Sequence, residues 1–235
     1  MHHHAPASDP LQLPFNDPEF VARYVEGPPR FVPGFADLHR MMAILFAEEV
    51  PADARVLVLG AGGGLELASL ARAQPGWTFD GVDPAAPMLE LAQRTLGPDA
   101  SRARLHRGTI DIAPMGPFHA AVCLLTLHFL PREERLRTLR EVHRRMKPGA
   151  PFVVAHSSFP QGPSERGRWL TRYARFALGS GADPAQVEKM RAGVEAHLHV
   201  LDPAEDERLL IEAGFSDVSL FYAAFTWRGW VARAM

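Results

Sequence analysis

The sequence predicts an α/β fold with a doubly wound, mostly parallel sheet. Between residues 55 and 155, apolar stretches of strand length alternate with amphipathic stretches of helix length. This alternation is typical of parallel strands whose connecting helices cover the two faces of one sheet. Two more apolar stretches, at 218–226 and 229–234, follow the last helical pattern and predict a terminal antiparallel pair.

The first expected strand and helix surround a cluster of glycines. The continuously apolar run 56–59 is what a parallel strand covered on both faces requires. Helical spacing begins at Leu65, and the glycines at 60 and 62–64 lie between the two elements. No Gly-Lys-Ser/Thr follows, so a phosphate-binding P-loop is excluded. Asp83 ends the next strand about 20 residues later, where an acid meets a ribose hydroxyl in nucleotide-binding βαβ units, and this spacing fits nicotinamide and S-adenosylmethionine cofactors alike.

The other elements are predicted from apolar periodicity and from start and stop residues. Asp17 and Pro18 predict the start of a short helix, which Gly27-Pro28-Pro29 is expected to end. The expected parallel strands are 56–59, 78–82, 104–106, 120–125 and 152–155. The expected helices are 18–25, 36–49, 65–71, 84–96, 133–146, 164–179, 184–197 and 205–213.

One domain is expected over residues 19–235, preceded by an irregular arm at 1–18. The four prolines in the first 18 residues favour irregular chain. Residues 157–200 interrupt the strand–helix alternation and predict two helices inserted over the carboxyl edge of the sheet. We expect this insertion to act as a mobile lid.

Composition argues against several classes of function. The net charge of −2 gives no overall attraction to nucleic acid, and the arginines at 168, 172 and 175 are expected to form a solvated helix face. No apolar run approaches the roughly 20 residues that cross a bilayer. The single cysteine, Cys123, excludes a disulfide within the chain and favours a cytoplasmic setting. We expect a monomer or homodimer that binds a small molecule and no metal.

Four motifs are more specific than the glycine cluster alone: VLVLGAGGG, GVDPAAPMLELAQ, LREVHRRMKPGAPFVV and LLIEAGFSDV. Together they resemble the class I S-adenosylmethionine-dependent methyltransferases, from Phe31 to Ala234. The resemblance implies a Rossmann-like, seven-stranded sheet with S-adenosylmethionine as cofactor and S-adenosylhomocysteine as product. Within that class, RFVPGF, LTLHFLP and the segment around Arg191 are most similar to the carboxy-S-adenosylmethionine synthases.

The resemblance also implies a set of cofactor-binding residues. Gly60, Gly62 and Gly64 correspond to the loop under the methionine and ribose parts of the cofactor, and Asp83 corresponds to the acid that accepts the ribose hydroxyls. The full set is Phe35, Gly60, Gly62, Gly64, Asp83, Pro84, Met88, Thr109, Ile110 and Leu124.

The chain departs from the family at four positions. Val58 replaces the usual acid two residues before the first loop glycine, and Thr109 replaces the acid at the adenine edge. Phe35 and Leu124 replace a tyrosine and an asparagine of the synthases. Each departure removes a polar contact worth about 0.5 to 1.5 kcal/mol.

Three residues are candidates for catalysis. Methyl transfer is a displacement at a sulfonium, which requires positioning and, for some acceptors, removal of a proton. His128 and His156 follow or end the fourth and fifth strands, where ligand sites gather, but each is also interpretable as a histidine held by backbone partners. Arg191 corresponds to the lid arginine that, in the synthases, pairs with the extra carboxylate.

Three functions remain open at this point. The leading hypothesis is methyl transfer to a small molecule held under the 157–200 insertion. A carboxy-S-adenosylmethionine synthase is the second hypothesis, favoured by Arg191 and opposed by Phe35 and Leu124. The third is a non-catalytic protein that binds an adenosyl ligand or a protein partner, suggested by Val58 and Thr109.

Overall fold

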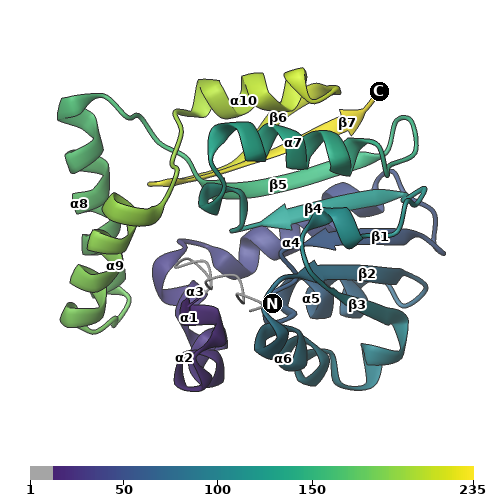
Figure 1. Cartoon of the computed structure of the whole chain (residues 1–235), viewed down its shortest axis with the longest axis horizontal. Helices are drawn as coiled ribbons and strands as arrows, with labels where there is room; N and C mark the ends of the chain where they lie inside the picture. Colours follow the sequence, from purple (N-terminus) through teal and green to yellow (C-terminus); the bar gives the residue numbers. More distant parts are fainter. Residues whose placement is uncertain (1–12) are drawn as a thin grey trace, which may run out of the picture.

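A computed structural model describes residues 13–235 and contains one seven-stranded sheet in the order β3-β2-β1-β4-β5-β7-β6 (Figure 1). Strands β1 to β5 are parallel, and β7 runs antiparallel to both of its neighbours. The predicted α/β fold class, with its antiparallel C-terminal pair, is therefore confirmed. The strands are β1 Arg55–Leu59, β2 Thr78–Asp83, β3 Ala103–Arg107, β4 Ala120–Leu124, β5 Pro151–Ser157, β6 Phe215–Ala224 and β7 Trp227–Ala234.

Helices cover both faces of this sheet and bury two hydrophobic cores. One core joins the sheet to α4 (Phe35–Ala47), α5 (Leu65–Ala73) and α6 (Ala86–Leu96). The other joins it to α7 (Arg132–His143) and α10 (Pro203–Glu212). Short 3₁₀ turns complete the connections: η2 Tyr24–Glu26, η3 Gly97–Arg102, η4 Ile110–Ile112 and η5 Leu127–Phe129.

The N-terminal segment is more helical than the sequence predicts. Residues 1–12 of the expected arm lie outside the described residues, whereas α1 (Leu13–Asn16) forms a helical turn. Asp17 caps α2 (Pro18–Arg23) as predicted, by accepting the Glu19 N–H. Gly27-Pro28-Pro29 does not end the helical segment but begins α3 (Gly27–Phe31). Proline is tolerated in a first helical turn, because its missing N–H would have no partner there.

The insertion predicted at 157–200 contains two helices, α8 (Pro163–Gly179) and α9 (Pro184–His197). They lie at the left of Figure 1, beside the carboxyl ends of β4 and β5. Leu170 and Tyr173 of α8 are buried, and Arg168, Arg172 and Arg175 are exposed, as the pattern predicts.

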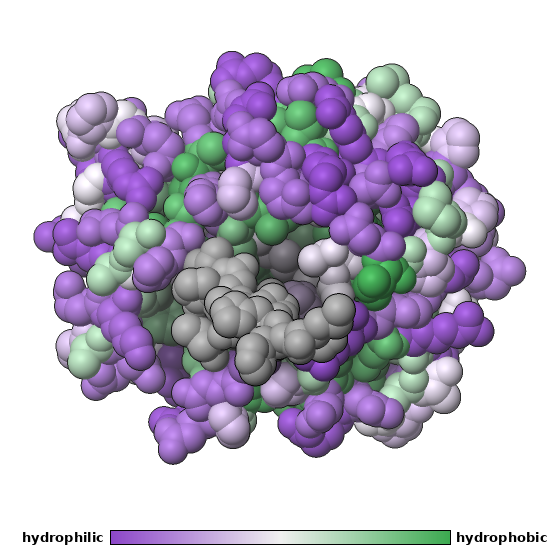
Figure 2. All heavy atoms as spheres, in the orientation of Figure 1, coloured by the Kyte–Doolittle hydropathy of each residue, from purple (hydrophilic) through white to green (hydrophobic). Residues whose placement is uncertain are grey.

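The surface on the side shown in Figure 2 is mainly hydrophilic, and hydrophobic residues appear between polar ones instead of forming a broad band. Over residues 13–235, no helix is both long enough and apolar enough to cross a membrane.

Candidate active site

The glycine loop between β1 and α5 has the backbone that its composition predicts. Gly60, Gly62 and Gly64 have φ angles of 72°, 44° and 80°, a left-handed region that other residues rarely adopt. Gly60 and Gly64 are also needed for packing, since an added Cβ would lie 2.0 Å from Thr126 Oγ1 and 2.7 Å from Ala92 Cα. At Gly62 the nearest atoms would be 3.6 Å away, so its surroundings are less crowded.

Asp83, at the end of β2, is held across this loop by two backbone hydrogen bonds. The Gly62 N–H donates to Asp83 Oδ2 at 3.0 Å, and the Ala85 N–H donates to Oδ1 at 2.9 Å. Burial raises the pKa of the carboxyl, and the hydrogen bonds from Ala85 and Gly62 oppose that rise. A carboxylate has about four acceptor sites, so Asp83 can still accept hydrogen bonds from a ribose diol.

The structure brings some of the other predicted cofactor residues to the same loop. Met88 is buried at 1% exposure, and its methyl group would lie 3.7 Å from a Cβ added to Gly62. Pro84 is half-buried beside Asp83, and Ile110 is buried in η4. Thr109 is exposed and donates its hydroxyl to Asp111 at 2.9 Å.

Phe35 and Leu124 occupy two more of the predicted positions. Phe35 is the first residue of α4 and is buried at 8% exposure. Leu124 is buried at the carboxyl end of β4. Neither side chain carries a hydrogen-bonding group, so neither can make the polar contact of the tyrosine or asparagine that it replaces.

Three residues beside the loop were not predicted as site residues. Tyr24, in η2, lies over the loop, because a Cβ added to Gly63 would be 2.8 Å from Tyr24 Cδ1. Glu66, in the first turn of α5, is 8% exposed, and its Oε1 lies 4.0 Å from Nε2 of the buried His39 of α4. Burial and the nearby negative charges of Glu66 and Asp83 raise the pKa of Tyr24, which places its hydroxyl near both carboxylates.

The Glu66–His39 pair carries no ion pair near neutral pH in the ligand-free protein. Burial, with a smaller contribution from Asp83, raises the pKa of Glu66 to about 7, although a hydrogen bond from its own backbone N–H opposes the rise. Burial lowers the pKa of His39 to about 4, so the imidazole is neutral. Within residues 13–235, His39 Nε2 has no hydrogen-bond partner.

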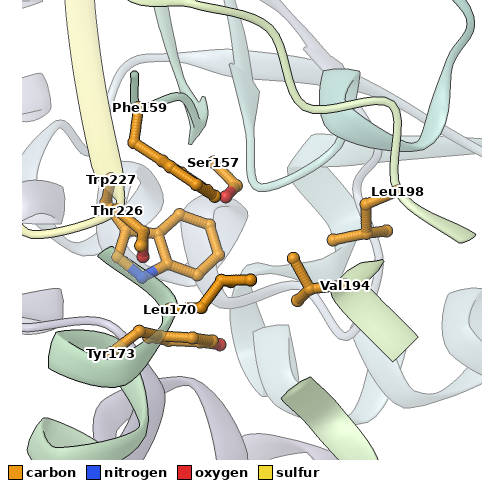
Figure 3. Close-up of a pocket in the computed structure, with 8 residues that line it drawn as sticks. All are labelled: Ser157, Phe159, Leu170, Tyr173, Val194, Leu198, Thr226 and Trp227. Atoms are coloured by element: carbon orange, nitrogen blue, oxygen red, sulfur yellow. The ribbon is translucent and has the colours of Figure 1, made fainter. Parts of the chain in front are cut away.

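A small apolar cavity lies between the α8–α9 pair and the ends of β5 and β7 (Figure 3). In the view, Leu170 and Tyr173 of α8 lie below the Trp227 indole, and Val194 of α9 lies to its right with Leu198. The enclosed space is about 20 Å³, which is room for about one water molecule. The cavity is lined by Ser157, Phe159, Leu170, Tyr173, Val194, Leu198, Thr226 and Trp227.

The two candidate histidines do not line this cavity. His128 is 4% exposed and accepts the Ser157 N–H through Nδ1 at 3.2 Å, which leaves the proton of a neutral ring on Nε2. The pKa of His128 is held well below its usual range, mainly by burial and to a smaller extent by the neighbouring side chains of His156 and Arg135. His156 is 2% exposed on the opposite face of β5 from Val153 and Ala155, and its Nε2 lies 3.1 Å from Asp206 Oδ1 in α10.

The third candidate, Arg191 of α9, lies outside the cavity lining. Its Nε lies 3.7 Å from Glu195 Oε1, one helical turn away, and its side chain is 40% exposed. In this arrangement the guanidinium is a surface group.

A sequence signal existed for one of the missed residues. Val58 stands where an acid is usual, and Glu66 follows the last loop glycine by two residues. Because the usual acid is missing at position 58 and Glu66 has no other assigned role, the sequence indicates that Glu66 could replace that acid. No comparable signal marks Tyr24 or His39, because the packing of η2 and α4 brings them to the loop.

Comparisons with known proteins agree with this architecture. The family model described as a methyltransferase domain matches residues 56–149. The carboxy-S-adenosyl-L-methionine synthase of Chromohalobacter salexigens is 28% identical over 224 residues, which cover 92% of this chain and 82% of that protein. The synthase of the same name from Actinobacillus succinogenes is 27% identical, with 86% of each chain covered.

A solved structure extends the comparison to three dimensions. Human N-acetylserotonin methyltransferase in complex with S-adenosylmethionine matches with a TM-score of 0.67 at 16% identity, over 97% of this chain and 60% of that one. The present chain thus spans about three fifths of that protein's length, and the likeness shows the fold alone. The family match, the curated relatives and the sheet order together favour the methyl-donor interpretation of the glycine loop over the nicotinamide one. Together, the methyltransferase-domain match over residues 56–149, these relatives and this fold support a class I S-adenosylmethionine-dependent methyltransferase.

Proposed function

We propose that this protein transfers the methyl group of S-adenosylmethionine to a small-molecule acceptor held beneath α8 and α9. The observation that carries the proposal is the apolar cavity between those helices and the ends of β5 and β7. Because β1 and β5 are both parallel members of the sheet, this cavity and the glycine loop lie at the same edge. Ligand sites of open α/β sheets gather at that edge.

The glycine loop and Asp83 are the proposed cofactor site. Gly62 is the least crowded of the left-handed loop glycines, with Tyr24 Oη 3.6 Å from an added Cβ, so Tyr24 would shift when the cofactor binds, and Asp83 retains free acceptor sites for ribose hydroxyls. Met88 and Ile110 supply apolar surface for the adenine ring. When bound, S-adenosylmethionine supplies an electrophilic methyl group on a sulfonium.

The cavity residues suit an acceptor with an apolar or aromatic body. Phe159, Tyr173 and Trp227 offer ring surfaces, and Ser157 and Thr226 offer hydroxyls. The Thr226 Oγ1 is buried and has no hydrogen-bond partner within residues 13–235. An acceptor with one polar group would satisfy that oxygen, and α8 and α9 must move apart to admit it, because the space is small.

We assign His128 and His156 to positioning instead of proton transfer. The Nδ1 lone pair of His128 is used by the Ser157 N–H, so the ring stabilises the end of β5. His156 faces Asp206 on the far face of the same strand. The chain's main contribution is then to position the acceptor and exclude water, and a proton on the acceptor must leave by another route.

A variant that fills the cavity tests this function. Val194→Trp is expected to abolish formation of S-adenosylhomocysteine with a panel of small aromatic acceptors, because the acceptor can no longer enter. The dissociation constant of S-adenosylmethionine should stay unchanged, since Val194 does not contact the glycine loop. Glu188→Gln, on an exposed position of the same helix, is the matched control. Full turnover by Val194→Trp would exclude the cavity as the acceptor site.

The proposed lid motion has its own measurement. Hydrogen exchange of residues 163–197 should slow on addition of cofactor and acceptor, because closing α8 and α9 over a ligand protects their amides. Exchange of α10 should not change and serves as the internal reference. Equal exchange of α8 and α9 with and without ligands would contradict the lid role.

A carboxy-S-adenosylmethionine synthase is the second candidate. The names of the two curated relatives favour it. The Arg191–Glu195 pair and the apolar Phe35 and Leu124 oppose it, because none of these positions in the described structure offers an unpaired polar side chain to an added carboxylate. Mass spectrometry of the ligand retained by the purified protein separates a methyl donor, its demethylated product and a carboxylated donor. An empty protein that forms no product would favour a non-catalytic binding role.

A further inference from the structure

Glu66 is a buried carboxylate without a cation to neutralise it. Within residues 13–235, the one basic side chain within ion-pair distance is His39, at 4.0 Å, and burial keeps that imidazole neutral. A buried carboxylate normally needs an opposite charge or several hydrogen bonds, because removing it from water is costly. The ligand-free protein therefore bears a cost at Glu66 that a cationic ligand would relieve.

The surroundings of Glu66 place it in the proposed cofactor site. It follows Gly64 by two residues and belongs to the positive N-terminal turn of α5. Its charge and that of Asp83 both act on Tyr24, whose ring lies over Gly63. On the other side, His39 lies against Phe35, with ring centroids 4.4 Å apart. Glu66 thus lies between the glycine loop and the start of α4.

Glu66 and Asp83 approach the loop from different elements, α5 and β2. Asp83 ends β2 and holds Gly62, whereas Glu66 lies beside α4, which packs on the β5 side of the sheet. If Asp83 binds the ribose, Glu66 is left for a different part of the cofactor. A cationic part would stabilise the ionised form of this buried carboxyl most strongly.

We propose that Glu66 binds the α-ammonium group of the cofactor's methionine part and replaces the acid that is absent at Val58. This inference rests on S-adenosylmethionine being the cofactor. An ammonium group offers three donors to a carboxylate, and a charge-assisted hydrogen bond is about twice as strong as a neutral one. A carboxylate aimed at the sulfonium methyl would instead compete with the acceptor as a nucleophile.

The proposal predicts that binding releases a proton. Burial raises the pKa of Glu66 to about 7 in the free protein, so at pH 6 most molecules carry a neutral Glu66. An ammonium group beside it favours the ionised form and lowers that pKa. Binding at pH 6 should therefore expel a proton from Glu66, and binding at pH 8.5 should not.

Calorimetry with three ligands tests which group Glu66 contacts. S-adenosylmethionine and S-adenosylhomocysteine share the ammonium, and 5′-methylthioadenosine lacks the whole amino-acid part. Glu66→Gln should weaken the first two about 10- to 100-fold and leave the third unchanged. Asp83→Asn should weaken all three, and Glu90→Gln, on the exposed side of α6, should weaken none.

The outcomes separate the inference from the function on which it rests. Unchanged affinity of Glu66→Gln for both amino-acid-bearing ligands would overturn the role of Glu66 and leave methyl transfer standing. Weakening confined to S-adenosylmethionine would assign Glu66 to the sulfonium instead. Equal weakening of 5′-methylthioadenosine would show general damage to the loop and also overturn the proposal. A wild-type protein that binds none of the three would remove the cofactor assignment itself.

Proton counting supplies a second readout. Titrations of S-adenosylhomocysteine at pH 6 in buffers with different ionisation enthalpies should show protons released by wild type and not by Glu66→Gln. Equal release from the two proteins would mean that another group titrates and would contradict the proposal.

Discussion

Two buried carboxylates, each beside a histidine, have opposite electrostatic surroundings in this molecule. Asp206 of α10 lies 2.5 Å from Arg135 Nη1 and 3.1 Å from His156 Nε2. Burial alone would raise the pKa of Asp206, but His156 and Arg135 outweigh it and the pKa is lowered. Glu66, on the α4–α5 face, has a neutral histidine 4.0 Å away and no cation within ion-pair distance among residues 13–235, and its pKa is raised to about 7.

The difference separates a structural charge from a binding charge. Asp206 is neutralised within the chain, and Arg135 also donates to the His199 carbonyl, so this network joins α7 to α10 and to the segment that follows α9. Glu66 has no such partner and gains one only from a ligand. A buried acid paired with a cation of the chain indicates architecture, whereas a buried acid without such a cation indicates a site.

Removing Arg135 should give the largest effect, because Asp206 would remain buried and unneutralised. Arg135→Met is expected to lower the free energy of unfolding by about 3 to 5 kcal/mol. For a chain of this length that corresponds to a fall in melting temperature of about 6 to 20 °C. Arg140→Met, on the exposed side of the same helix, should change stability by about 1 kcal/mol or less. Similar melting temperatures for the two variants would show that Arg135 stabilises the protein no more than the surface residue Arg140 does.

Glu66→Gln should have the opposite effect and raise the free energy of unfolding of the ligand-free protein. A carboxyl whose folded pKa is raised binds more protons when folded, so its contribution to stability falls as pH rises from about 4.5 to about 7. The glutamine side chain does not ionise, so the variant avoids this fall in stability. It should be more stable than wild type by about 3 kcal/mol at pH 8 and no more stable below pH 4.5. Urea unfolding across this range measures the gain. A pH-independent gain would mean that Glu66 is not the titrating group.

The fold could be predicted because its signals are local. The apolar run at 56–59 and the periodic helix ahead of Lys147-Pro148-Gly149 indicate buried strands and amphipathic helices without reference to distant residues. The error at Gly27-Pro28-Pro29 is also local, since the same residues can end one helix or begin the next.

The candidate site could be predicted only in part. The backbone of the glycine loop and Asp83 follow from spacing, but the meeting of His39 with Glu66 requires two helices to pack. His156 shows a different limit. It lies in β5 near the carboxyl edge as expected, yet alternate side chains of a strand face opposite ways, so Ser157 lines the cavity and His156 meets Asp206.

Thr226→Val extends the comparison to the acceptor cavity, where the unsatisfied group is neutral. The Oγ1 of Thr226 is buried without a hydrogen-bond partner among the described residues, and valine has nearly the same shape. Removing the hydroxyl should raise stability by about 1 kcal/mol, or about 2 to 4 °C in melting temperature. The same change should raise the KM for an acceptor that hydrogen-bonds to it. Lower stability would show that the hydroxyl already has a water or protein partner.

Arg191→Ala should have the smallest effect, because Arg191 is a surface charge paired with Glu195 one turn away. Such pairs contribute about 0.3 to 0.5 kcal/mol, and the 40% exposure of this side chain increases screening by solvent. We therefore expect unchanged binding of S-adenosylmethionine and a melting temperature within about 2 °C of wild type.

Incubation of wild type with S-adenosylmethionine and prephenate should yield no carboxylated cofactor by mass spectrometry, since Phe35 and Leu124 provide no polar contacts for it. A carboxylated product that disappears in Arg191→Ala would show that α9 turns this guanidinium inward during catalysis. Arg191 would then resemble Glu66, because its oppositely charged partner would be a ligand.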